Sequence, residues 1–256
     1  MIRGFYNARS GLIAHQDRLN VISNNIANVN TVGFKPMRTA FKDLIYQNLN
    51  RRTAENEVQT GHGVKVNKND ILISQGAPAY TGRELDLTLI GENNFFAVQT
   101  RGGEIRYTRS GNFSWNNDDG TWYLVNGNGE RLLDSDWQVI EAQPDDNGKL
   151  PSFNGMGELM FPGSADVEAE AGIFSFSNPF GLWSMEGTTF YPTPESGPAL
   201  QVDPQDRSLV QAYLENSSVE IAHEMVSMIE AQRAFSFNSR MVQTADEVEQ
   251  IVNSLR

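Results

Sequence analysis

The chain has 256 residues, 39% of them hydrophobic and 10% aromatic, which is enough for a packed core in one large or two smaller domains. Its 32 acidic and 20 basic residues give a formal net charge of −12, so neither a nucleic-acid backbone nor an anionic lipid surface is expected as the main partner. Cysteine is absent, which excludes disulfides, thiolate metal ligands and cysteine nucleophiles. Residues 1–20 carry charges throughout and no later run is as apolar as a membrane span, so neither a secretory signal nor membrane insertion is expected.

The N-terminal segment predicts a long amphipathic helix. Apolar or small residues recur in steps of three and four along one face: Phe5, Ala8, Leu12, His15, Leu19, Ile22, Ile26 and Val29. An isolated helix with such a stripe is not stable in water, so it needs a surface on which to dock. Because asparagine is poor in helix interiors and glycine suits a left-handed cap, we expect the helix to end between Asn28 and Gly33, with Phe34 folding back onto the stripe.

Two further segments precede the middle of the chain. Arg38 to Asn48 predicts a second helix, with Phe41, Leu44 and Ile45 on one side. From Asn50 to Lys68 the composition is polar and apolar periodicity is lost, which indicates a linker or an extended arm.

The middle of the chain predicts an all-β region. Short alternating or apolar runs, separated by Gly, Asn and Asp clusters, occur at 85–90, 94–99, 105–108, 112–115, 122–125, 131–133 and 137–140. The sequences NNDDG at 116–120 and NGNG at 126–129 are hairpin signals. A calcium loop at Asp118 and Asp119 is the alternative, but no Glu follows at the loop-closing spacing. Loops are expected at 144–151 and 191–204.

From Ser208 the sequence predicts helix up to the C-terminus. Its apolar positions are Val219, Ala222, Val226 and Ile229, followed by Met241, Ala245, Val248, Val252 and Leu255, and the register drifts between the two groups. A continuous helix from Leu209 to Leu255 would be about 70 Å long, more than a domain of this size can bury. Chain ends usually fray, so strong helical patterning at both ends favours a subunit that docks on other copies.

Several stretches of the sequence resemble the bacterial flagellar rod and hook protein family. They are SGL at 10–12, NVISNNIANVNT at 20–31 and GFK at 33–35, then DLTLIGENNFFAV at 86–98, YTRSGNF at 107–113 and FSNPFGL at 176–182, and finally LENSSVEIAHEMVSMIEAQRAFSFNSRMVQTADEV at 214–248. The resemblance covers most of the chain and is weakest at 50–63 and 132–173.

This resemblance implies an α+β protein in which long terminal helices form a coiled-coil-like inner layer and a mainly antiparallel β domain lies outside. It implies four regions: an N-terminal helical segment at 1–49, an arm at 50–68, a β-rich outer domain at 69–207 and a C-terminal helix at 208–256. It also implies a structural axial subunit of the basal-body rod that self-assembles into a helical tube and transmits torque. The implied partners are copies of itself, other rod and hook proteins and the flagellar type III export apparatus, and the implied location is the zone outside the cytoplasmic membrane, reached without a cleaved signal peptide. The length is similar to that of rod proteins and shorter than that of hook subunits, with distal and proximal rod both open.

Two alternatives are a short hook-type subunit and, from another class, a rod-associated enzyme acting on peptidoglycan. His15, His62 and His223 share no metal-ligand spacing. Glu84 and Asp86 are two residues apart on a predicted strand edge, but nothing near them would separate their pKa values. We therefore predict no catalytic, cofactor-binding or metal-binding residue.

The predicted functional residues are subunit contacts. Four asparagines where the first helix ends would cap it or fix the register between neighbours, and apolar residues would form the helix-to-helix core, between copies or within the chain. The predicted contact residues are Leu12, Leu19, Ile22, Asn24, Asn25, Ile26, Asn28, Asn30, Gly33, Phe34, Met225, Val226, Ile229, Arg233, Phe235, Met241, Val248 and Val252.

Overall fold

A computed structural model describes residues 2–44, 47–48, 59–118, 120–145, 148–161, 167–184, 188–203 and 207–255. The chain divides into two compact units. The first, here called the helical unit, comprises Met1–Ala27, Met37–Asp70 and Glu220–Arg256. The second, the β-rich unit, comprises Asn28–Pro36 and Ile71–Val219.

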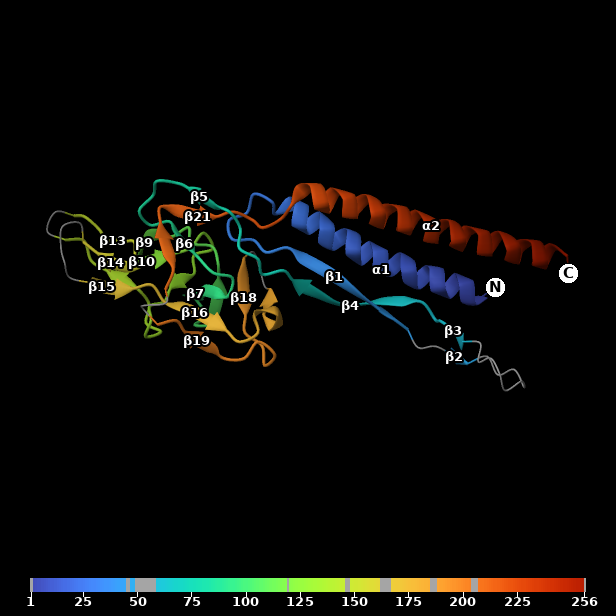
Figure 1. Cartoon of the computed structure of the whole chain (residues 1–256), viewed down its shortest axis with the longest axis horizontal. Coiled ribbons are helices and arrows are strands. Elements are labelled where there is room, and N and C mark those ends of the chain that lie inside the picture. Colours follow the sequence, from blue (N-terminus) through green and yellow to red (C-terminus); the bar gives the residue numbers. More distant parts are fainter. Residues whose placement is uncertain are drawn as a thin grey trace. The chain divides into compact units, whose positions relative to one another are not determined.

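The helical unit is built on α1 (Ile2–Ala27) and α2 (Ile221–Ser254). The two helices lie side by side and run in opposite directions (Figure 1). Strands β1 (Met37–Asp43) and β4 (Val64–Ile71) pair into a two-stranded ribbon, of which β1 packs against α1, and β2 (Gln47–Asn48) pairs with β3 (Gln59–Thr60). The stripe predicted on the first helix is thus covered in part by elements of the same chain.

The helix predicted at Arg38–Asn48 is wrong, because β1 occupies Met37–Asp43 as a strand. The side chain of Asn25 accepts a hydrogen bond from the Met37 backbone N–H at 3.0 Å and donates one to the Met37 carbonyl at 2.8 Å, as a neighbouring strand would. Pairing with β4 and packing on α1 thus override a weak helical pattern. Ile45 lies outside the described residues. The predicted polar arm ends in strands β3 and β4, and its residues 51–58 also lie outside the described part.

The start of the C-terminal helix also differs from the expectation. α2 begins at Ile221, whereas residues 209–215 form strands β20 (Leu209–Gln211) and β21 (Tyr213–Glu215). β20 pairs with β6 (Leu87–Leu89) and β21 pairs with β5 (Pro78–Tyr80), both antiparallel. Leu209 lies opposite Leu89 and both are buried, so burial in the sheet decides the local structure. At 34 residues, α2 is about 50 Å long rather than 70 Å.

The β-rich unit is mainly antiparallel. Its largest sheet runs in the order β12 (Glu141–Ala142), β10 (Thr121–Val125), β11 (Arg131–Leu132), β7 (Asn94–Gln99), β8 (Ile105–Thr108), β18 (Thr189–Tyr191) and β17 (Trp183–Ser184). β9 (Ser114–Asp118) joins it through β10, β16 (Ile173–Phe176) through β7, and β19 (Ala199–Gln201) through β16. A smaller sheet contains β13 (Ser152–Phe153), β14 (Glu158–Met160) and β15 (Val167–Glu170), and a 3₁₀ turn covers Pro179–Gly181.

Both predicted hairpins are present. β9 and β10 pair from Ser114↔Val125 to Asp118↔Thr121, and Gly120 has the positive φ of 91° that such a tight turn requires. The Asp118 carboxylate pairs with Arg131 at 2.8 Å, and Asp119 lies outside the described residues. The strand predicted at 137–140 is reduced to one bridge at Val139, because Trp137 adopts a positive φ of 63° in a turn.

The core of the β-rich unit fills the space beside the large sheet. Its completely buried members include Leu87, Leu89, Phe96, Val98, Phe113, Leu124, Leu132 and Leu159. A second group of rings, Phe95, Tyr107, Phe174, Phe176 and Phe190, pack edge to face with centroids 4.8 to 6.1 Å apart. The predicted all-β middle is therefore a packed unit with its own core.

Candidate assembly surface

Small residues bring the two terminal helices together. Ala231 is completely buried, and small residues on the same face of α2 are half-buried: Ser227 and Ala234 one turn away, Asn238 two turns away and, farther along, Ala245. On α1 the buried residues Ala8, Gly11 and Ala14 are also small. Side chains of this size let the helix backbones approach closely.

Three contacts set the register of this helix pair. Asn25, 1% exposed near the end of α1, donates to Glu224 Oε1 in the first turn of α2 at 3.1 Å. Arg18 forms an ion pair with Glu230 at 3.6 Å. Gly11 lies against Asn238. The buried amide carries most of this specificity, since exposed ion pairs contribute little.

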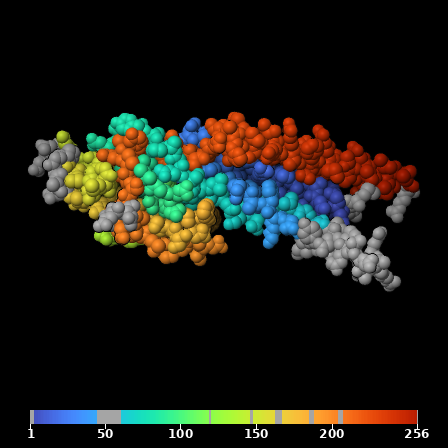
Figure 2. Space-filling model, in the orientation of Figure 1, coloured from blue at the N-terminus to red at the C-terminus, as the bar shows by residue number. Residues whose placement is uncertain are grey.

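Many large apolar residues of α2 are exposed in the single chain. Met225, Val226 and Ile229 are 51 to 57% exposed, and Met241, Val248 and Val252 are 39 to 56% exposed. Phe237, Ile251 and Leu255 are exposed as well. In the space-filling view α2 forms an open ridge along the helical unit (Figure 2). The surface formed by these residues, here called the α2 outer stripe, is left largely exposed by the described part of the chain.

The predicted contact residues thus differ in their exposure within the single chain. Leu12, Leu19, Ile26, Asn28 and Phe235 are half-buried, and Asn24, Asn30 and Arg233 are exposed. Ile22, Asn25, Gly33 and Phe34 are buried inside the chain, so in this conformation a second copy cannot reach them. Phe34 belongs to the β-rich unit and not to the stripe of α1. What the sequence could not indicate is that Ala231 is buried within the chain whereas Met225, Ile229 and Met241 are left exposed.

A groove opens where α1 begins and α2 ends. It is lined by Phe5 and Tyr6 from α1 and by Ala245, Asp246, Glu249, Val252 and Asn253 from α2. The groove combines apolar side chains with two carboxylates and is continuous with the α2 outer stripe through Val252.

The groups considered for enzyme chemistry occupy other environments. Asp86 is buried, accepts a hydrogen bond from Thr81 Oγ1 at 2.7 Å and pairs with Arg83 at 3.5 Å, while Glu84 is exposed. Burial and the nearby Arg18 lower the pKa of His15, whose ring contacts Phe41 at 5.6 Å. Across the described ranges no group of three or more His, Asp or Glu side chains could hold a metal ion.

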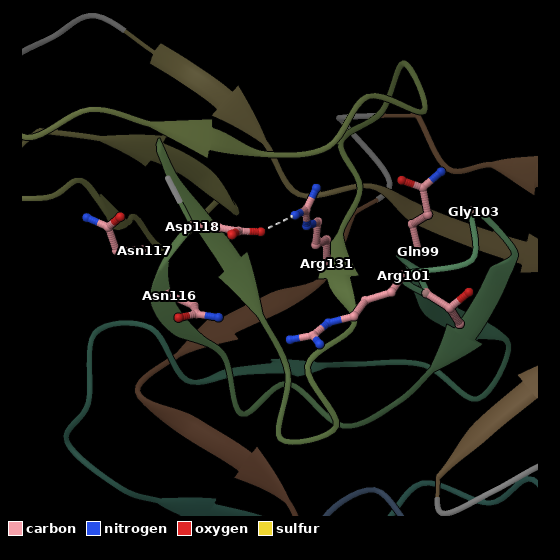
Figure 3. Close-up of a pocket in the computed structure, with 8 residues that line it drawn as sticks. Gln99, Arg101, Gly103, Asn116, Asn117, Asp118 and Arg131 are labelled. Carbon is pink, nitrogen blue, oxygen red and sulfur yellow. Dashed lines mark hydrogen bonds and ion pairs between the residues drawn. The ribbon is translucent and has the colours of Figure 1, made fainter. Parts of the chain in front are cut away.

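A polar hollow lies on the β-rich unit. Gln99, Arg101, Asn116, Asn117 and the ion pair of Asp118 with Arg131 line it (Figure 3). Arg131 also stacks on the Tyr123 ring, 3.8 Å from its centroid.

Neither helix in the described part of the chain is long and apolar enough to cross a membrane.

Paired terminal helices with an exposed apolar stripe, joined in sequence to a β-rich unit, are typical of a structural subunit. Three family descriptions match the chain: "Flagella basal body rod protein" over residues 5–35, "Flagellar hook protein FlgE/F/G D1 domain" over residues 89–160 and "Flagellar basal body rod FlgEFG protein C-terminal" over residues 210–255.

Similar proteins extend this match to the whole chain. The flagellar basal-body rod protein FlgG of Bacillus subtilis (strain 168) is 34% identical over 100% of both chains, and FlgG of Caulobacter vibrioides is 34% identical over 97% of both. The flagellar hook-basal body complex protein FlhP of Bacillus subtilis is 27% identical over the full length of both. The chain belongs to the family of bacterial flagellar basal-body rod proteins, and it is a structural component and not an enzyme.

Proposed function

We propose that this chain is an axial subunit of the flagellar rod that self-assembles into a helical tube and transmits torque. In this tube α1 and α2 form a coiled-coil-like inner layer, and the β-rich unit forms an outer one. The observation that carries the proposal is the α2 outer stripe, in which large apolar residues remain exposed although Ala231 on the same helix is buried.

The free energy gained by burying the side chains of the α2 outer stripe supports self-association. Completing the burial of a half-exposed Met, Ile or Val side chain is favourable by about 1 kcal/mol. The stripe holds several such residues along the second half of α2, and one copy repeats the contact of the previous one. A heterologous contact that repeats without closing a ring builds a helical assembly.

The partners and the location follow from family membership and stay part of the proposal. We infer that the chain contacts copies of itself and other rod and hook proteins, and that the flagellar type III export apparatus delivers it. The inferred place is the basal body outside the cytoplasmic membrane, reached without removal of a signal peptide. The absence of cysteine suits a structural chain that needs no disulfide to fold.

Charged substitutions on the stripe test the proposal. Met241→Glu together with Val226→Glu should abolish polymerisation, measured by sedimentation and electron microscopy, because each places a carboxylate in the contact. The helical circular dichroism signal of the single chain should be unchanged, since both side chains are exposed there. Gln138→Glu, an exposed change in the β-rich unit and therefore outside the stripe, serves as the control. Polymers of normal length from the double variant would refute the proposed assembly surface.

A further inference from the structure

The chain passes between the helical unit and the β-rich unit four times, after residues 27, 36, 70 and 219. The segments of the β-rich unit next to these crossings meet at three charged residues, Lys35, Arg109 and Glu215. All three side chains are completely buried. The group, here called the buried triad, brings together residues up to 180 positions apart in the sequence.

The Glu215 carboxylate is the centre of the triad. Its Oε1 accepts hydrogen bonds from Lys35 Nζ at 2.6 Å and from the Gly76 backbone N–H at 2.7 Å. Its Oε2 accepts one from Arg109 Nε at 2.8 Å. Glu215 therefore links the segment before α2 to the segments that follow α1 and β4.

Backbone contacts complete these links. The Glu215 carbonyl accepts the Gly33 N–H at 2.8 Å, and the Phe34 carbonyl accepts the Ser218 N–H at 3.3 Å. The Pro36 carbonyl accepts the Leu72 N–H at 2.8 Å, and Lys35 Nζ also donates to the Ser74 carbonyl. Within the β-rich unit, the segment next to each crossing is therefore hydrogen-bonded to the segment next to another crossing.

Arg109 anchors the triad to the body of the β-rich unit. Its Nη1 donates to the carbonyls of Gly91, Glu92 and Asn94 at 2.8 to 3.0 Å. Gly33, at φ +69°, packs closely against Ser110, the residue after Arg109. A Cβ on Gly33 would lie 2.7 Å from the Ser110 backbone nitrogen. Only glycine therefore lets the segment after α1 reach this anchor.

Stability alone does not account for this arrangement. Burying two cations and one anion costs free energy of desolvation, and apolar residues of similar size often stabilise a fold as well or better. Burial lowers the pKa of Lys35, and the Glu215 carboxylate only partly offsets this. Charged hydrogen bonds are strong and geometrically specific, so they hold particular segments of the chain together.

We propose that Lys35, Arg109 and Glu215 form a mechanical clasp that fastens all four chain crossings to the β-rich unit, so that load applied to the helices is shared by every crossing. The clasp rests on the proposed function, because a torque-bearing axle is what would load these crossings. Lys35, Arg109 and Glu215 are positioning residues in this role.

Single-molecule pulling of the full chain tests the clasp. Because the chain has no cysteine, handles can be attached at chosen exposed positions: Asn117→Cys in the β-rich unit, combined with either Arg9→Cys on α1 or Arg240→Cys on α2. The first pair loads the crossing after residue 27, and the second loads the crossing after residue 219. The readout is the lifetime of the folded β-rich unit under constant force.

Lys35→Met is the informative variant, because it leaves Glu215 and Arg109 as a charge-balanced pair that can still fold. The clasp predicts that this change shortens the lifetime about tenfold in both pulling directions, which corresponds to about 1.4 kcal/mol. Arg207→Met is the control, since the Arg207 side chain is only 4% exposed and pairs with Glu170 at 2.6 Å but ties no crossing. The proposal would be overturned if Lys35→Met shortened the lifetime only with the Asn117 and Arg9 handles. It would also be overturned if Arg207→Met shortened the lifetime equally.

Hydrogen exchange of the unaltered chain gives a second test that needs no variant. If the clasp opens as one unit, the amides of Gly33, Gly76 and Ser218 should exchange with the same free energy of opening. Three independent opening free energies would contradict it. Both tests use the single chain, so a failure to polymerise would refute the proposed function without deciding the clasp.

Discussion

Gly11 of α1 lies against Asn238 of α2 so closely that a β-carbon on residue 11 would be 2.9 Å from the Asn238 amide nitrogen. The Asn238 side chain is itself held in place, because it donates to the Ala234 carbonyl at 3.0 Å. Glycine in a helix costs about 1 kcal/mol relative to alanine. This cost is accepted at a position where the two helices are in close contact.

A double-mutant cycle follows from this contact. Gly11→Ala alone should change the stability of the helix pair little, because the gain in helix propensity is offset by the displaced Asn238 amide. In an Asn238→Ala background the same change should stabilise by about 1 kcal/mol. Thermal unfolding followed at 222 nm measures the difference. Equal effects in both backgrounds would show that the two residues are not coupled.

Asn25 should be the most sensitive of the asparagines that end α1. Asn25→Ala leaves the Met37 backbone N–H and carbonyl and the Glu224 carboxylate without their partner, at an expected cost of about 2 kcal/mol. Asn25→Asp should cost more, because it places a second carboxylate 3.1 Å from Glu224 Oε1. Asn30→Ala, at an exposed position, is the control. Urea unfolding followed by circular dichroism measures all three, and a neutral Asn25→Ala would show that the amide does not hold these elements together.

Alkaline pH should weaken the β-rich unit through Tyr107. Burial raises the pKa of Tyr107 from 10.0 to about 12. The unfolded chain therefore ionises first, so the stability present below pH 10 is lost as the pH rises from 10 towards 12. Tyr107→Phe should reduce this loss, whereas Tyr80→Phe, at a 72% exposed position, should not. The test compares the melting temperatures at pH 8 and pH 11, and identical pH dependence in all three chains would contradict it.

Ala212 lies between β20 and β21 with a positive φ of 62°, a conformation that is strained for any residue with a β-carbon. Its N–H donates to the Asp86 carbonyl at 2.8 Å, and its own carbonyl accepts the Thr81 N–H at 2.9 Å, so the surrounding strands hold it in place. Ala212→Gly should therefore stabilise by about 0.5 kcal/mol despite the greater entropy of the unfolded chain. Ala199→Gly in extended strand β19 should destabilise instead. Chemical denaturation of both variants checks the opposite signs.

Much of the architecture could be predicted from local patterns. The strands at 94–99 and 105–108 have the predicted bounds, and both hairpins occur where Asn, Asp and Gly cluster. These features depend on alternation and on turn residues, which are local properties. β1 and the start of α2 were predicted wrongly because their structure depends on distant partners, namely Asn25 with β4 for β1 and strands β5 and β6 for residues 209–215.

The direction in which each helix face points was beyond the sequence. The apolar residues of α2 predicted contacts between copies or within the chain, and in the single chain Met225, Ile229 and Met241 are exposed whereas Ala231 is buried. Periodicity shows that a helix has two faces, but several faces of α2 could pack on α1. The Gly11–Asn238 contact and the Asn25–Glu224 hydrogen bond select the small one.

By itself, the sequence determined the helical ends, the β-rich middle and the family, because periodicity, turn residues and motif strings lie within short stretches of chain. Only the tertiary structure decided which apolar residues remain open to another copy and that Lys35, Arg109 and Glu215 meet in the interior. The physical reason is that exposure and the burial of charge depend on partners up to about 200 residues away, which no local pattern records.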